Sequence, residues 1–184
     1  MSDQNLTAIY AKDLIKSYGS FRALKGIDLQ VHSGEIFGFL GPNGAGKTTA
    51  IRCMLDMIRR DNGIIEIFGK DPQTESVAVR DLCGYLPGEL RLDENASVKS
   101  ILNYLRRLRQ GGKDCSAKIS QLASRLDLNL DSKIKNLSKG NKQKLGIIAA
   151  FMHKPKLLLL DEPTSGLDPL VQQIGLELVK EAKQ

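Results

Sequence analysis

Short apolar runs bounded by Gly, Asn, Asp or Pro recur along this sequence and are typical of strands. Five runs are predicted as strands: 7–14, 26–31, 35–40, 64–69 and 157–160. The last is an unbroken leucine run, which is typical of a central parallel strand covered on both faces. The run at 35–40 is also expected to be a buried strand. Residues 16–20 are predicted as a turn, in which Tyr18 is either a hairpin aromatic or a platform for a purine ring.

Apolar residues at three- and four-residue spacing predict helices in the remaining segments. These helices are expected near 47–58, 75–82, 98–108, 119–126 and 145–152. Ser97 is the expected N-cap of the third helix, Gly111–Gly112 its expected end, and Pro155 stops the fifth. Gly84–Pro87 is predicted to lead into a loop. Because the third and fourth helices have no strand between them, residues of about 90–136 are expected to form a helical insertion on an α/β core.

The length and composition are those of one globular domain, predicted to span 1–184. No apolar run approaches the roughly 18 residues that a membrane span needs, and the N-terminus does not resemble a signal peptide. The chain is therefore expected to be cytoplasmic unless a partner recruits it. Its three cysteines show neither metal spacing nor a pairing pattern, so they are expected to be reduced thiols.

The net charge of +6 suggests a nucleic-acid or membrane-surface partner. Two basic clusters carry most of the excess: Arg106, Arg107 and Arg109, and Lys133, Lys135, Lys139, Lys142 and Lys144. Aromatic residues do not alternate with these cations, as they do in proteins that bind single-stranded nucleic acid. Solvated faces are the favoured interpretation, and no nucleic-acid partner is expected.

A glycine-rich segment, here called the phosphate loop, follows the run at 35–40. Its residues are Gly41-Pro42-Asn43-Gly44-Ala45-Gly46-Lys47-Thr48-Thr49, and they fit the pattern G-x-x-x-x-G-K-[ST]. Glycines let backbone N–H groups converge on phosphates, and a helix N-terminus adds its positive dipole end. Lys47 is expected to reach the β- and γ-phosphates, and the Thr48 hydroxyl to ligate magnesium. The segment therefore predicts binding of a nucleoside triphosphate.

Two carboxylates, Asp161 and Glu162, come directly after the leucine run. Ligands of parallel sheets bind beyond the carboxyl ends of the strands, so these residues are expected beside the phosphate loop. Asp161 is suited to hold magnesium, directly or through water. Glu162 is suited to orient or deprotonate the attacking water. Either residue alone would be interpreted as a surface or capping acid, but a phosphate loop in the same chain favours the catalytic interpretation.

Further motifs flank the carboxylates: Leu137-Ser138-Lys139-Gly140-Asn141 before them and Ser165-Gly166-Leu167-Asp168 after them. With the phosphate loop, this order resembles the ATP-binding cassette (ABC) ATPases over nearly the whole chain. Within the family it is most similar to subunits paired with bacterial multidrug-type exporters. The resemblance implies a P-loop NTPase core with a mostly parallel sheet, an N-terminal antiparallel β subdomain and a helical insertion subdomain.

The resemblance also implies roles for residues of one nucleotide site. Tyr18 matches the aromatic that stacks on adenine, and Gly41–Thr49 matches the Walker A loop. Asp161 and Glu162 match the Walker B aspartate and the catalytic glutamate.

A second group of matched residues implies a dimer. Ser138 and Gly140 are retained from the signature segment, which in the family contacts the γ-phosphate held by a second subunit. Ser165–Asp168 matches the D-loop at the same interface. ATP and magnesium are therefore expected between two ABC ATPase subunits, identical or different.

The sequence departs from the family pattern in three places. Lys139 and Asn141 replace a glycine and a glutamine of the signature, and Glu89 stands near where the family has a glutamine. The family also carries a histidine on a later strand, and neither His32 nor His153 fits that role. The chain is therefore expected to lack the last strand or strands at the C-terminus, and to show little steady hydrolysis alone.

The leading hypothesis is an ATPase subunit that energises a transmembrane permease, an exporter, from the inner face of the cell membrane. One alternative is a soluble ABC ATPase that acts on nucleic acid or ribosomes, for which the basic clusters argue. Another is a non-catalytic nucleotide-binding regulator, for which the missing histidine argues.

Overall fold

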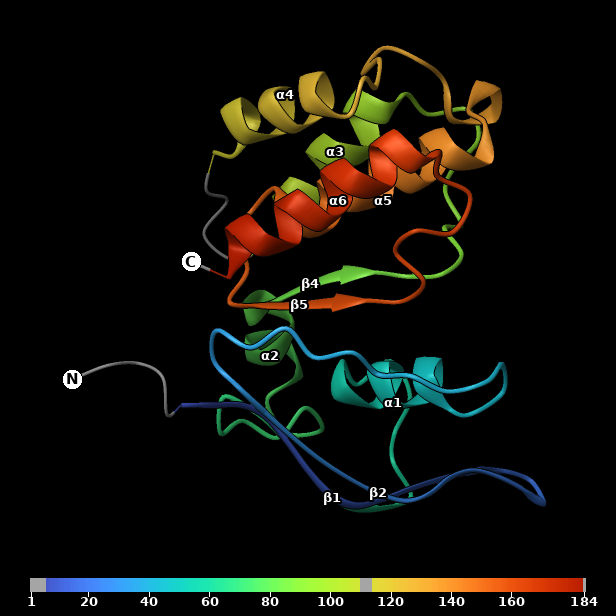
Figure 1. The fold of residues 1–184 in the computed structure, drawn as a ribbon, viewed down its shortest axis with the longest axis vertical. Coiled ribbons are helices and arrows are strands. Elements are labelled where there is room, and N and C mark those ends of the chain that lie inside the picture. Colours follow the sequence, from blue (N-terminus) through green and yellow to red (C-terminus); the bar gives the residue numbers. More distant parts are fainter. Residues whose placement is uncertain (1–5, 110–113, 184) are drawn as a thin grey trace. The chain divides into compact units, whose positions relative to one another are not determined.

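The structure is a computed structural model that describes residues 6–109 and 114–183. These residues fall into two compact units, one up to Leu82 and one from Cys83 to Ala182 (Figure 1). The expected helix end at Gly111–Gly112 lies outside the described residues. The expectation of a single domain with an insertion at about 90–136 stays a prediction.

The first unit is built on an antiparallel sheet of three strands in the order β2-β1-β3. β1 (Thr7–Tyr18) and β2 (Phe21–His32) form a long hairpin, and β3 (Asn62–Ile67) pairs with the other edge of β1. The N-terminal antiparallel subdomain expected from the family resemblance is therefore present.

Two helices complete the first unit: α1 (Lys47–Met54) and α2 (Ser76–Leu82). The apolar face of α1 contacts β2 and β3, because its buried residues recur at helical spacing. The largest fully buried side chains of this core are Leu14, Leu24, Leu55, Ile65 and Ile67.

The second unit combines a parallel pair of strands with four α-helices in its described part. β4 (Cys83–Leu86) pairs with β5 (Leu157–Leu160) in register, with Cys83 opposite Leu157 and Leu86 opposite Leu160. The helices are α3 (Val98–Arg107), α4 (Ser116–Arg125), α5 (Lys139–Phe151) and α6 (Pro169–Ala182), with a short 3₁₀ turn η2 at Ile134–Asn136.

Helix α5 lies at the centre of this unit. It contacts β4, α3 and α4, so apolar side chains are buried around most of its circumference rather than along one stripe. α3 begins at a capping box in which Ser97 and Ser100 bond reciprocally, which confirms the predicted N-cap. In the described part of the chain no strand separates α3 from α4, as expected.

The predicted buried strand at 35–40 is wrong. The segment has no strand partner among the described residues, and Ile36, Phe37 and Leu40 are 54%, 46% and 91% exposed. An apolar run becomes a strand only where another strand hydrogen-bonds to it, and it becomes buried only where other elements cover its faces. The sequence pattern carries no information about those non-local partners.

Two further predictions need correction. Gly84–Pro87 does lead into a loop, but the sequence analysis missed that residues 83–86 form the strand β4 before it. The strand forms by pairing with residues 157–160, a partner more than seventy residues away that the local pattern does not show. The predicted turn at 16–20 is shorter: Tyr18 ends β1 and only Gly19 and Ser20 make the turn, with Gly19 at φ 58°. Within the leucine run only Leu159 is buried, since β4 is its one described strand neighbour.

Candidate nucleotide site

The phosphate loop connects an irregular segment to the first turn of α1. Gly44 and Gly46 have positive φ angles of 84° and 90°, which glycine adopts without steric cost. Gly46 is the N-cap of α1, so the helix begins at Lys47 as predicted. A Cβ atom at Gly46 would lie 2.7 Å from the Ala23 carbonyl oxygen and from a Leu24 methyl group. The end of the β1–β2 hairpin therefore packs against the loop and leaves room there only for glycine.

The Lys47 ammonium lies over its own loop. Its Nζ donates hydrogen bonds to the carbonyl oxygens of Gly41, at 2.5 Å, and Pro42, at 2.9 Å. Residues 41–45, which include Asn43 and Ala45, are all exposed to solvent. Thr48 and Thr49 follow in the first helical turn. A cation, a helix N-terminus and exposed glycine backbone together provide what a phosphate group needs.

Tyr18 lies at the end of the hairpin that packs against the phosphate loop. Its ring is 47% exposed, and it stands opposite Phe21 in the sheet register. The Lys16 ammonium lies 5.8 Å from the ring centroid, within the range of a cation–π contact. Both sequence interpretations of Tyr18 remain open, because it is a hairpin aromatic and an accessible ring.

The second unit holds the residues of a second segment, 161–168, here called the carboxylate loop. Asp161 is 6% exposed, and its N–H donates to the Leu86 carbonyl oxygen at 2.9 Å, which extends the β4–β5 ladder. Glu162 is exposed and has a φ of 50°, the left-handed conformation that costs a residue with a side chain about 1–2 kcal/mol. Asp161 is thus buried, whereas the adjacent Glu162 is exposed to solvent.

The signature segment packs against the carboxylate loop. Ser138 caps α5, accepting a hydrogen bond from the Asn141 N–H at 3.2 Å. A Cβ atom at Gly140 would lie 2.9 Å from the Gly166 carbonyl oxygen, so glycine is needed for this close approach. The Lys139 ammonium donates to the Ser165 hydroxyl at 3.4 Å, so this departure from the family pattern contacts the carboxylate loop.

The predicted site residues are therefore divided between the units. Tyr18 and the phosphate loop lie in the first, and Asp161, Glu162, Ser138 and Gly140 lie in the second. Their expected assembly into one site stays a prediction. Glu89 is exposed and pairs with Arg91 at 3.3 Å.

Sequence reasoning missed two neighbours of the carboxylates. A Cβ atom at Gly88 would lie 3.6 Å from Asp161 Oδ2, so Gly88 borders that carboxylate. Gln143 is 6% exposed and donates from Nε2 to the carbonyl oxygens of Glu162, at 3.3 Å, and Pro163, at 3.5 Å. Gln143 lies among the polar residues of the first half of α5, between Lys142 and Lys144, so the sequence pattern did not distinguish it.

The basic clusters are partly engaged in internal contacts. Arg106 pairs with Asp114 at 3.1 Å, and Arg109 donates to the Cys83 carbonyl oxygen at 2.6 Å.

Burial raises the pKa of the Cys53 thiol to about 11 and that of the Cys83 thiol to about 12. All three cysteines are free, as expected. Among the described residues no helix has the length and apolar character to cross a membrane.

Comparison with known proteins identifies the family. The ABC transporter family model matches residues 24–165. The ABC transporter ATP-binding protein YhaQ of Bacillus subtilis is 39% identical over 172 residues, which cover 91% of this chain and 55% of that protein. The daunorubicin resistance ATP-binding protein DrrA3 of Streptomyces coeruleorubidus is 39% identical over 166 residues, 89% of this chain and 52% of that protein.

The fold agrees with this result. A solved structure described as the ATP binding subunit of an ABC transporter superposes with a TM-score of 0.88 at 31% identity, over 96% of this chain and 75% of that one. The chain spans about half the length of YhaQ and DrrA3. Phosphate loop, carboxylate loop and signature segment thus occur in the order and fold of one known group, and the chain belongs to the ABC transporter family.

Proposed function

We propose that this chain binds and hydrolyses ATP and thereby energises transport, as an exporter, through a partner membrane protein. The observation that carries the proposal is the phosphate loop: exposed glycine backbone, the N-terminus of α1 and the Lys47 ammonium converge in one segment. Relatives named for daunorubicin resistance, multidrug transport and Nod factor export support the transport assignment.

The donor groups fit a magnesium ion that binds together with the nucleotide. Thr48 offers a hydroxyl oxygen and Asp161 a buried carboxylate, and Mg²⁺ prefers oxygen ligands. Mg²⁺ bound with a nucleotide usually takes its other ligands from phosphates and water. When bound, the ion would offset charge on the β- and γ-phosphates.

The chain's own residues divide the remaining work. The Lys47 ammonium exchanges its two loop carbonyls for phosphate oxygens, and the N–H groups of residues 44–49 bind the same phosphates. Tyr18 stacks on adenine with its exposed ring. The exposed Glu162 carboxylate orients the attacking water and accepts its proton.

Two partners belong to the proposal. A second ABC ATPase subunit, of the same or another kind, contributes Ser138 and Gly140 to the γ-phosphate bound by the first. A transmembrane permease holds the pair at the inner face of the membrane. The exposed N-cap of α5 supports the first contact, because the Ser138 side chain is accessible at a helix N-terminus.

Titration calorimetry with ATP and magnesium tests nucleotide binding. Lys47→Ala is expected to weaken affinity roughly tenfold to a hundredfold, since hydrogen bonds to charged groups contribute about 1.5–3 kcal/mol. Lys25→Ala is the matched control, because it removes an exposed cation from β2. Equal affinities in both variants would contradict the phosphate-loop assignment.

A further inference from the structure

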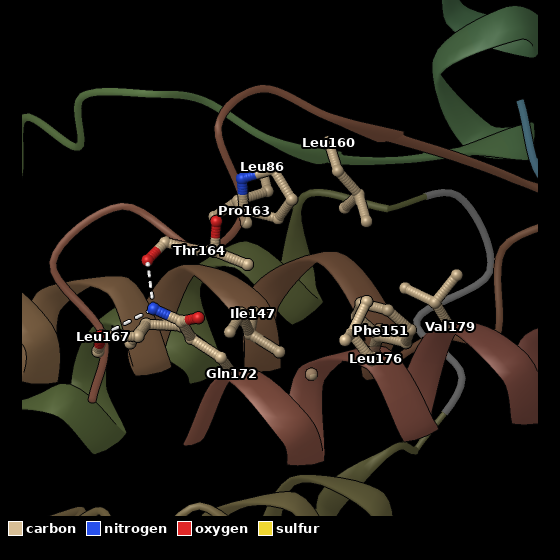
Figure 2. A pocket seen from close by; sticks show the side chains of 11 residues that line it. Leu86, Ile147, Phe151, Leu160, Pro163, Thr164, Leu167, Gln172, Leu176 and Val179 are labelled. Carbon is tan, nitrogen blue, oxygen red and sulfur yellow. Dashed lines mark hydrogen bonds between the residues drawn. The ribbon is translucent and has the colours of Figure 1, made fainter. Parts of the chain in front are cut away.

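The carboxylate loop is held in place by two glutamine side chains from different helices. Gln143 of α5 donates to the carbonyl oxygens of Glu162 and Pro163, at 3.3 and 3.5 Å. Gln172 of α6 donates to those of Leu167, at 3.0 Å, and Thr164, at 3.5 Å. Figure 2 shows the Gln172 amide between the last two residues. Side-chain amides thus satisfy both ends of the loop.

Apolar packing does not by itself position this loop. A cavity of about 30 Å³ lies beneath Pro163, Thr164 and Leu167, between the strands, α5 and α6 (Figure 2). An unfilled space leaves the lining atoms without dispersion contacts on that side. The directional hydrogen bonds of the two glutamines therefore restrain the loop where packing is incomplete.

Glu162 is the residue of the loop that most needs restraint. Its φ of 50° is unfavourable for a side-chain-bearing residue, so an unrestrained loop would relax to another conformation. Its carbonyl oxygen accepts two hydrogen bonds, one from Gln143 and one from the Ser165 N–H at 3.1 Å. Gln143 is one of only two polar side chains classed as buried in the described residues, and the other is Asp161.

We propose that Gln143 is a positioning residue: its amide holds the Glu162 backbone in the left-handed conformation and so sets the direction of the Glu162 carboxylate. The inference rests on the proposed function in one respect, that Glu162 acts on the attacking water. The step from amide to carboxylate is short, because the bonded carbonyl and the side chain belong to the same residue.

Two backbone amides report the two glutamines separately. The Ser165 N–H shares the Glu162 carbonyl with Gln143, and the Leu167 N–H, at 3.3 Å, shares the Thr164 carbonyl with Gln172. Residue-resolved hydrogen exchange on the 184-residue chain measures both. Gln143→Leu is expected to speed exchange at Ser165 roughly fivefold and leave Leu167 unchanged, the factor typical of losing one hydrogen bond. Gln172→Leu is expected to do the reverse.

A catalytic readout separates positioning from folding. It uses the chain extended with the C-terminal segment of the Bacillus subtilis relative. Gln143→Leu should lower the maximal rate of ATP turnover tenfold to a hundredfold, the cost of a misplaced catalytic group, with ATP affinity unchanged. Gln172→Leu should retain the rate. Gln143→Met keeps side-chain length without a donor and replaces the leucine variant if that variant does not fold.

Unchanged exchange at Ser165, or equal increases at Ser165 and Leu167, would overturn the inference. So would a normal turnover rate in a Gln143 variant whose Ser165 exchange is faster. If the extended wild-type chain binds ATP without hydrolysing it, the proposed function fails instead. Exchange at Ser165 then still decides whether Gln143 holds Glu162.

Discussion

The phosphate loop and the carboxylate loop are stabilised in different ways. In the phosphate loop, Lys47 bonds carbonyls five and six residues before it, and Gly44 and Gly46 adopt left-handed conformations without strain. In the carboxylate loop, Glu162 adopts such a conformation although it is not glycine, and the restraining groups come from α5 and α6.

This difference separates local from tertiary control. A loop built from glycine and an adjacent helix start carries its geometry in its own residues, so a sequence motif identifies it. A loop held in an unfavourable conformation depends on distant partners, which a motif does not include. The comparison predicts that changes in the phosphate loop act on binding, and changes in the carboxylate loop act on rate.

The largest expected effect is on turnover. Glu162→Gln, in the chain extended with the C-terminal segment of its Bacillus subtilis relative, should bind ATP normally and hydrolyse it about a hundred to ten thousand times more slowly, because it loses a general base. It should also accumulate as an ATP-bound dimer. Phosphate release and size-exclusion chromatography with ATP and magnesium measure both. A monomeric variant with undiminished turnover would contradict the assignment.

The second effect concerns the close approach at Gly46. Gly46→Ala forces a Cβ atom to within 2.7 Å of the Ala23 carbonyl oxygen at a φ of 90°. It should lower the free energy of unfolding by about 2–4 kcal/mol and weaken ATP binding. Gly44→Ala is the matched control, since its φ is 84° but no atom lies within 4 Å of the added Cβ. Urea titration of both variants isolates the clash; equal losses would mean that backbone strain alone matters.

A smaller effect is expected at Tyr18. Base–aromatic stacking contributes about 1–3 kcal/mol, so Tyr18→Ala should weaken ATP binding clearly and Tyr18→Phe hardly at all. Calorimetry compares the two. If the phenylalanine variant binds as weakly as the alanine variant, a hydroxyl contact is the better explanation.

The smallest expected effect concerns an ion pair of the first unit that belongs to neither loop, Arg60–Asp71. Arg60 donates two hydrogen bonds to Asp71, at 2.6 and 2.9 Å, and lowers the pKa of that carboxyl. A depressed carboxyl pKa stabilises the fold above the unfolded pKa, and this contribution is lost as the pH falls through the folded value. Asp71→Asn should cost about 1 kcal/mol at pH 7, given the partial exposure of the pair.

Urea titrations from pH 7 to pH 2 measure that contribution. The difference between wild type and Asp71→Asn should shrink on acidification, as the wild-type carboxyl becomes protonated. ATP affinity should not change. A difference that is constant with pH would show that Asp71 stabilises the unit by packing rather than by charge.

Several features followed from the sequence by itself. The start of α1 at Lys47, the capping of α3 at Ser97 and the helical character of α4 and α5 were predicted and are present. Each depends on residues within a few positions of one another: a glycine before a lysine, a serine hydroxyl before a helix, apolar residues at three- and four-residue spacing. Local interactions of this kind can be predicted from the order of residues alone.

Only the tertiary structure decided the rest. Residues 83–86 are a strand because residues 157–160 pair with them. Residues 35–40 are also rich in apolar side chains, but they are not a strand because no described strand pairs with them. The left-handed Glu162 and its restraint by Gln143 were likewise invisible in the motif. Hydrogen bonds between segments far apart in the chain determine these features, and local patterns of apolar and polar residues do not specify which distant segments meet.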